Sequence, residues 1–327
     1  MTSTLEQAPP TTPDRRTRVA RFLADNGALV GLVVLCVALF IATPDFLTGR
    51  NLLNIGIQVS TVAVLAFGVT FVIVAGGIDL SVGSVAALSS MVSGWFFASA
   101  GLPGWLALLA GLLTGLLTGV VNGLASAYGR LPSFIATLAM LSVARGLTLV
   151  ISDGRPIPTS PQVSFLGSDV GPVPVPVIVL VLAALVASFV LNRTVVGRSM
   201  YAVGGNPEAA RLSGLPVQRI LVTVFALSGL FAALAGLLLA GRLDSAQPQA
   251  AVGYELDAIA AVVIGGASLA GGVGRISGTV IGALVLVVIR NGLNLLNVTS
   301  FWQQVVIGLV IAIAVGFDVL RRRTRTG

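Results

Sequence analysis

Residues 197–214 read Gly-Arg-Ser-Met-Tyr-Ala-Val-Gly-Gly-Asn-Pro-Glu-Ala-Ala-Arg-Leu-Ser-Gly, a polar and glycine-rich stretch between two long apolar runs. The stretch predicts a short helix, because Asn206 is a good N-cap, Pro207 suits the first helical position and Gly214 can end the helix in a left-handed conformation. A helix of roughly two turns is not stable alone in water. It therefore needs a surface that holds it, and its paired alanines offer a smooth face that a partner could grip. An ordinary ordered loop is the alternative.

The composition of the whole chain is that of an integral membrane protein. Hydrophobic residues make up 56% of the 327 residues and charged residues only 9%, whereas soluble domains carry about 25% charged residues. A membrane-spanning helix needs ~20 apolar residues, so we predict an all-α bundle of about ten transmembrane helices with a short helix outside the bilayer. The apolar runs cover residues 27–42, 52–76, 82–99, 105–127, 131–151, 174–191, 219–241, 257–273, 277–293 and 301–319.

Charge at the ends of the chain predicts its orientation. A disordered basic tail at 1–26 and a second basic tail at 320–327 flank a transmembrane domain at 27–319, and an even number of spans puts both tails on one side. All 19 basic residues are Arg, and most of them fall on that side, which the positive-inside rule identifies as cytoplasmic. The loop 192–218, which holds the short helix, lies there too. We expect a multi-pass protein of a bacterial plasma (inner) membrane.

Missing residue types exclude several kinds of chemistry. The chain has no Lys, so it lacks a phosphate-binding P-loop and cannot form a Schiff base. It has no His and a single Cys, Cys36, so it lacks the usual ligands of zinc or haem and any internal disulfide. We expect no catalytic residue, no metal site and no bound cofactor. The positive charge is dispersed at the ends of apolar runs, which argues against nucleic-acid binding.

Two connections on the outer side are long enough to receive another protein. Residues 152–173 are rich in Pro, and residues 242–256 carry charged and amide side chains. Plain solvated loops are the common explanation for such stretches. The functional interpretation is a docking surface for an extracytoplasmic binding protein, formed by Asp153, Arg155, Arg242 and Asp244.

Polar residues inside the apolar runs have either structural or functional roles. Arg145 lies in the middle of the fifth run, where a lipid-facing charge costs about 3 kcal/mol or more, so we expect it to bond carbonyls or a carboxylate between helices, or else to contact substrate. Asp79 is expected to cap the helix that follows it. Few other carboxylates lie in the runs, which argues against an ion-coupled carrier.

Uncharged polar and aromatic side chains suit a pathway for a neutral polar solute. Amides satisfy hydroxyl groups without burying charge, and aromatic rings cover C–H surfaces. Each of these residues alone is more often explained by helix–helix hydrogen bonding or by an interfacial belt. As a set, the candidates for a sugar-like cargo are Asn54, Gln58, Asn122, Phe134, Asn294, Trp302 and Gln303.

A weak internal repeat links two glycine-rich segments. Residues 74–83, Val-Ala-Gly-Gly-Ile-Asp-Leu-Ser-Val-Gly, align with residues 263–272, Val-Ile-Gly-Gly-Ala-Ser-Leu-Ala-Gly-Gly. Internal repeats are common in transporters, although glycine-rich apolar segments also match by chance.

Several motifs together resemble the ribose-type permeases of ABC importers. They are Gly-Gly-Ile-Asp-Leu-Ser-Val-Gly-Ser at 76–84, Leu-Pro-Ser-Phe-Ile-Ala-Thr-Leu at 131–138, Arg-Gly at 145–146, Gly-Arg-Pro-Ile at 154–157, the loop at 204–214, Tyr-Glu-Leu-Asp-Ala-Ile-Ala-Ala-Val-Val-Ile-Gly-Gly at 254–266 and Asn-Gly-Leu-Asn-Leu-Leu-Asn-Val-Thr-Ser-Phe-Trp-Gln at 291–303. The similarity runs from about residue 50 to 318. One departure is Ala-Ser at 267–268, where many members have Thr-Ser.

The resemblance implies a permease dimer, of two copies or of this chain and a paralogue, on a pair of ATPase subunits that hold ATP and Mg. A sugar-binding protein outside the membrane would deliver a monosaccharide, and alternating access would carry it into the cytoplasm. A nucleoside importer with the same machinery, or less closely an ion-coupled secondary carrier, is the alternative. In the family the loop after the sixth span couples to the ATPase, which carries over to Gly205, Asn206, Glu208, Ala209, Ala210, Arg211 and Gly214.

Overall fold

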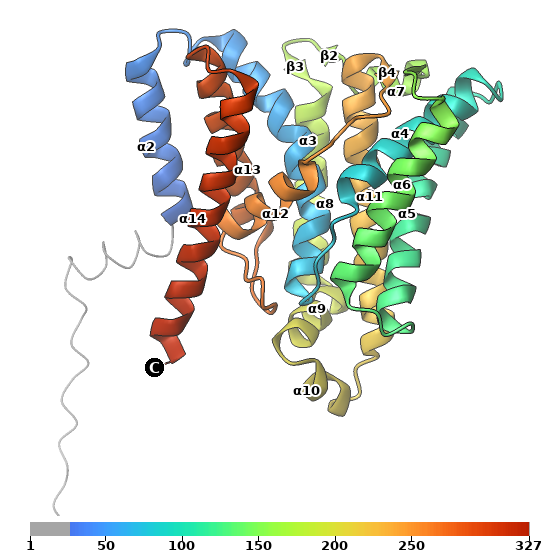
Figure 1. Cartoon of the computed structure of the whole chain (residues 1–327), viewed down its shortest axis with the longest axis vertical. Helices are drawn as coiled ribbons and strands as arrows, with labels where there is room; N and C mark the ends of the chain where they lie inside the picture. Colours follow the sequence, from blue (N-terminus) through green and yellow to red (C-terminus); the bar gives the residue numbers. More distant parts are fainter. Residues whose placement is uncertain (1–26, 327) are drawn as a thin grey trace, which may run out of the picture.

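The computed structural model describes the backbone of residues 27–326 and the side chains through residue 313, and it consists mainly of helices (Figure 1). The expected tail at 1–26 lies outside the described residues. The helices of the apolar runs are α2 (Gly27–Ala42), α3 (Gly49–Val74), α4 (Val82–Ala98), α5 (Gly104–Ala127), α6 (Ser133–Ser152), α8 (Val175–Arg193), α11 (Val217–Leu243), α12 (Tyr254–Ile264), α13 (Ile276–Leu295) and α14 (Ser300–Thr326).

The short elements gather at the two ends of the bundle (Figure 1). One end, which we call the α10 end, carries α9 (Val195–Gly205) and α10 (Pro207–Leu212). The other end, which we call the α7 end, carries α7 (Pro161–Phe165) and two small antiparallel sheets. The sheets pair β1 (Ile157–Pro158) with β4 (Ser245–Ala246), and β2 (Asp169–Val170) with β3 (Val173–Pro174).

Each of the ten apolar runs contains a helix, but the helices differ in length. Within the described residues, six are long and apolar enough to cross a membrane: α3, α5, α6, α8, α11 and α13. Two departures concern the ends of runs. The expected span at 257–273 is wrong at its end, since α12 stops at Ile264 and the chain continues as a glycine-rich loop. Helix α14 continues through Thr326, beyond the expected end at 319.

Helix α3 is the centre of the bundle. Beyond its polar first turns it is mainly apolar, and 89% of its most apolar window is buried, as expected for a helix that has neighbours on every side. Phe67 and Phe71 are fully buried and both pack against the ring of Phe231 on α11. The core of the protein therefore lies along α3 and α11.

Glycines bring α5 and α11 into close contact. On α5 they recur every four residues, at 111, 115, 119 and 123, so they line one face of the helix. A Cβ added at Gly115 would overlap the carbonyl oxygen of Gly229, and one at Gly119 would overlap that of Phe225. Such small-residue faces let helix backbones approach closely where no hydrophobic effect drives them together.

A pair of buried asparagines joins α3 to α13. The side-chain amides of Asn51 and Asn291 exchange two hydrogen bonds, 3.0 and 2.7 Å between nitrogen and oxygen, and Asn51 also donates to the carbonyl oxygen of Phe46 at 2.8 Å. Both side chains are buried. The pair fixes the relative rotation of the two helices at the α7 end.

We expect Asn291→Leu to lower the free energy of unfolding by about 1–3 kcal/mol, because it leaves the Asn51 amide without its partner. The double replacement of both asparagines by Leu should cost less than the sum of the single changes, since no unpaired amide then remains opposite a Leu. Thermal melting of the four proteins in detergent measures this cycle. Additive losses would show that the two amides do not act as a pair.

Candidate functional site

Helix α10 forms where the sequence predicts a short helix. Asn206 is its N-cap, and its side-chain oxygen accepts a hydrogen bond of 2.9 Å from the amide of Ala209. Pro207 occupies the first turn. Gly214 follows the helix with φ +81°, the left-handed conformation expected of a terminating glycine. The helix is thus confirmed, from Pro207 to Leu212.

The surface of α10 differs from the expected one at two positions. Glu208, Ala209 and Arg211 are exposed, but Ala210 is buried, with 5% of its surface exposed. The pair of alanines therefore does not present one smooth outer face, because helical neighbours point about 100° apart. Leu212 is 82% exposed, an apolar surface position that the expected set of contact residues left out.

A second helix, α9, supports α10 and was also missed. It occupies Val195–Gly205, where the sequence suggested only a glycine-rich loop. Thr194 caps it, since its hydroxyl oxygen accepts a hydrogen bond of 3.1 Å from the amide of Gly197. This N-cap was the signal in the sequence that could have revealed the helix.

At the end of α9, Gly204 packs directly on backbone. Its neighbours are the carbonyl oxygen of Val74, the last residue of α3, and the loop between α12 and α13 at Gly271 and Gly272. A Cβ at Gly204 would overlap the Val74 oxygen and lie 2.8 Å from the Gly272 nitrogen. The amide of Gly272 donates to that same Val74 oxygen at 2.9 Å. We call these four residues, Val74, Gly204, Gly271 and Gly272, the glycine junction.

Tyr201 adds a side-chain contact beside the glycine junction. Its hydroxyl donates to the carbonyl oxygen of Gly274 at 2.7 Å. Burial raises the pKa of Tyr201, and the nearby charge of Arg275 offsets part of that rise. The phenol therefore stays protonated and able to donate at neutral pH. Helix α9 thus rests on the loop after α12 through both backbone and side chain.

The two glycine-rich segments of the internal repeat end helices in the same way. Helix α3 is followed by Gly76 with φ +82°, and α12 by Gly266 with φ +90°. The amides of Gly77 and Ala267, one residue on, each reach back to a carbonyl oxygen five residues earlier, on Val72 and Val262. In the structure, Gly76 corresponds to Gly266 and Gly77 to Ala267, an offset of 190 residues. The alignment of 74–83 with 263–272 has an offset one residue smaller, so it is wrong by one residue.

Asp79 has a different role from the expected cap. The N-cap of α4 is Ser81, and the Asp79 carboxylate accepts bonds from the Ser81 amide at 2.9 Å and from its hydroxyl. The other carboxylate oxygen accepts from the hydroxyl of Ser228 on α11 at 2.8 Å. Asp79 therefore ties the loop before α4 to α11. Asn122, a candidate for the pathway, is buried and donates to the Ser81 hydroxyl at 2.9 Å.

Arg145 bonds to carbonyl oxygens, the first of the two roles considered. One guanidinium nitrogen donates to the carbonyl oxygens of Pro248 and Ala250, at 2.9 and 3.0 Å. Both belong to the connection between β4 and α12, where Ala251 has φ +55°. Arg145 thus holds this irregular connection against α6.

The β1–β4 pair brings the two outer connections together. Ile157 lies opposite Ala246, and Pro158 opposite Ser245. The four candidate docking residues, Asp153, Arg155, Arg242 and Asp244, are exposed and flank these strands at the α7 end. They therefore belong to one surface, although the sequence separates them into two segments.

The candidate pathway residues do not converge within this chain. Asn294 accepts a bond of 2.7 Å from the side-chain amide of Gln303. Asn54, which is exposed, and Gln58, which is partly buried, lie one turn apart on α3. Asn122 lies on α5, and the exposed Phe134 and Trp302 lie on α6 and α14. Their role in transport stays a prediction.

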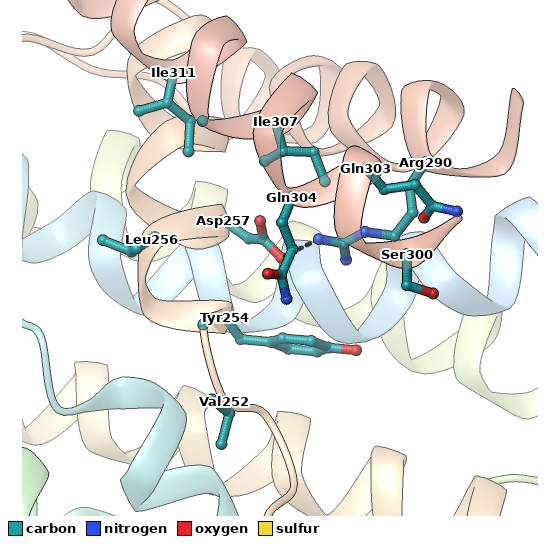
Figure 2. A pocket seen from close by; sticks show the side chains of 12 residues that line it. Val252, Tyr254, Leu256, Asp257, Arg290, Ser300, Gln303, Gln304, Ile307 and Ile311 are labelled. Atoms are coloured by element: carbon teal, nitrogen blue, oxygen red, sulfur yellow. Dashed lines mark hydrogen bonds and ion pairs between the residues drawn. The ribbon is translucent and has the colours of Figure 1, made fainter. Parts of the chain in front are cut away.

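A cavity of about 500 Å³ lies between α12, α13 and α14 (Figure 2). Of the pathway candidates, Gln303 lines it. Arg290 and Asp257 also line it, and they form an ion pair with 3.0 Å between nitrogen and oxygen. Sequence reasoning missed the cavity, because its polar residues come from three different segments.

Comparisons with known proteins identify the family of the chain. A family model described as "Branched-chain amino acid transport system / permease component" matches residues 51–315. The ribose import permease RbsC of Bacillus subtilis is 48% identical over 317 residues, which cover 94% of this chain and 96% of the relative. RbsC of Escherichia coli K12 is 44% identical (94% and 98% covered), and the L-arabinose permease AraH of the same strain is 40% identical (91% and 92% covered). The chain therefore belongs to this family of transporter permease components, and it is similar over nearly its whole length to permeases of sugar import.

Proposed function

We propose that this chain is the permease subunit of an ATP-driven importer that moves a monosaccharide such as ribose into the cytoplasm. The observation that carries the proposal is the similarity to ribose import permeases, 44–48% identical over nearly the full length of both chains. The family model is described by another cargo, branched-chain amino acids, so the cargo is the point to test first.

The orientation in the membrane follows from the positions of the arginines. Arg130, Arg198, Arg211 and Arg275 belong to connections at the α10 end, whereas Arg50, Arg155 and Arg242 belong to the α7 end. Arg193 and Arg219, beside α9 and α11, add to the positive charge of the α10 end. This excess supports a cytoplasmic α10 end.

In this orientation the exposed surface of α10 meets an ATPase subunit, which holds ATP and Mg. Closure of two ATPase subunits would push α10 and α9, and the glycine junction would pass that movement to α3 and to the loop after α12. A second permease, identical or a paralogue, completes the pathway. A loaded sugar-binding protein docks at the α7 end, on the surface beside β1 and β4. The permease can change state in this way only if its contacts with the ATPase and the binding protein differ between the two states of alternating access.

Uptake into proteoliposomes tests this function. The chain is reconstituted with a ribose-type ATPase and binding protein, and accumulation of D-ribose, L-arabinose, a nucleoside and L-leucine is measured. We expect ATP-dependent accumulation of a sugar. Accumulation without the ATPase would identify an ion-coupled carrier, and transport of the nucleoside or of leucine alone would refute the sugar assignment.

Glu208→Lys should uncouple ATP hydrolysis from uptake while the permease stays folded. Glu208 is exposed in the first turn of α10, so a lysine costs the helix only about 0.3–1 kcal/mol through the helix dipole, but it reverses charge on the proposed ATPase contact. Hydrolysis and uptake are measured on the same proteoliposomes. Arg219→Glu, a charge reversal at an exposed position of α11, is the control. Equal coupling ratios in both variants would contradict the role of α10.

A further inference from the structure

We propose that the cavity between α12, α13 and α14 is a binding site for a neutral polyhydroxylated solute, at which Arg290 and Asp257 bond its hydroxyl groups and Tyr254 covers its ring. The inference rests on the proposed function and deepens it, because it assigns the cargo to particular residues. At about 500 Å³ the cavity falls within the range of small-molecule pockets, about 300–1,000 Å³.

The ion pair is the first observation that points to a ligand. Arg290 lies on α13, one of the helices able to cross a membrane, and 31% of its side chain is exposed, against 8% for Asp257. Charged groups at membrane depth are costly, and they commonly mark the path of a substrate or ion. Both residues line an open cavity, so a solute in the cavity can reach the pair.

The ion pair also has unused bonding capacity. The guanidinium carries five N–H donors, and one of its nitrogens is bonded to one Asp257 oxygen. Among the described residues, no other hydrogen bond engages the Arg290 or Asp257 side chains. A sugar hydroxyl is both donor and acceptor, so one hydroxyl can accept from Arg290 while another donates to Asp257.

Three further polar side chains line the same space without a partner. The Tyr254 hydroxyl, the Ser300 hydroxyl and the Gln304 amide form no hydrogen bond within the described part of the chain. Figure 2 shows Gln304, Arg290 and the ring of Tyr254 converging on the cavity. An aromatic face beside hydrogen-bonding groups suits a sugar, whose ring has C–H surfaces as well as hydroxyls.

The other wall of the cavity is apolar. Leu256, Ile307 and Ile311 line it, so the site has one polar and one apolar side. A cation is a poor occupant, since no group of three or more His, Cys, Asp or Glu that could hold a metal occurs in the described residues. The cavity extends along α14 from Ser300, the first residue of that helix. Helix α14 starts at the α7 end (Figure 1), the end at which the proposed binding protein would release its cargo.

The position of α12 explains why the site exists. Helix α12 is short and begins at Tyr254 in the middle of the bundle (Figure 1), after Gly253 with φ +83°. Asp257 lies in its first turn. Discontinuous helices of this kind place helix ends and polar side chains at membrane depth, where transporters bind their substrates.

Cysteine protection tests the site without relying on transport. In a Cys36→Ser background, Gln304→Cys lines the cavity, and Phe301→Cys is the matched control one turn earlier, at a position that is 82% exposed and outside the cavity. The purified permease–ATPase complex is treated with a water-soluble thiol reagent in the presence of D-ribose, in the presence of the same concentration of L-leucine, or with neither solute. We expect ribose to slow modification of Gln304→Cys at least threefold and to leave Phe301→Cys unchanged.

The outcomes separate this inference from the proposed function. Equal rates with and without ribose at Gln304→Cys, in a complex that still accumulates ribose, overturn the site but keep the importer. Failure of Gln304→Cys to react at all while Phe301→Cys reacts would mean that the cavity is covered by a second subunit, and it would also overturn the site. Arg290→Gln, which keeps a donor but removes the charge, should abolish the protection if the site is correct.

Discussion

Replacing Gly204 with alanine is expected to destabilise the permease by about 3 kcal/mol and to abolish coupled uptake. Insertion of extra carbon into a packed interior typically costs about 1–3 kcal/mol, and here the added Cβ would meet backbone, which cannot turn away as a side chain can. The new atom would overlap the Val74 oxygen and approach the Gly272 nitrogen. The hydrogen bond between those two atoms would therefore have to break or shift.

The next residue provides the control for this change. A Cβ at Gly205 would meet nothing within 4 Å, so Gly205→Ala should melt like the wild type. Because Gly205 belongs to the proposed ATPase contact, this variant is the control for stability alone. Melting in detergent and sugar uptake are measured for both variants. Wild-type melting and uptake in Gly204→Ala would show that α9 does not rest on α3 as described. Normal melting with ATP hydrolysis but no uptake would indicate that the glycine junction transmits movement.

Arg145→Leu is expected to lower the free energy of unfolding by about 2–3 kcal/mol. It removes two hydrogen bonds from a charged donor and leaves the carbonyl oxygens of Pro248 and Ala250 without that partner. The connection between β4 and α12 should then loosen. Because that connection directly follows β4, beside which the proposed docking surface lies, stimulation by the binding protein should fall as well.

Two variants separate this role from substrate contact. Arg145→Lys keeps a charged donor that can reach one carbonyl, so it should recover part of the stability. Ser142→Ala changes an exposed residue on the same helix and should melt like the wild type. Unchanged melting of Arg145→Leu together with lost transport would place Arg145 in the pathway instead.

Local patterns in the sequence were enough for the class of fold and for α10. Long apolar runs can only be helices in a bilayer, because every backbone polar group must then be bonded within its own segment. The signals that begin and end α10 lie within nine residues of one another, from Asn206 to Gly214. These features depend on neighbours in the chain, and the chain by itself determines them.

Only the tertiary structure decided which distant segments meet. The glycine junction joins residue 74 to residues 204 and 272, Arg145 reaches residue 250, and the proposed sugar site draws on α12, α13 and α14. Glycines in an apolar sequence look alike, and a polar residue does not reveal its partner. What distinguishes them is close packing between helices far apart in the chain, which depends on the shapes of both surfaces at once.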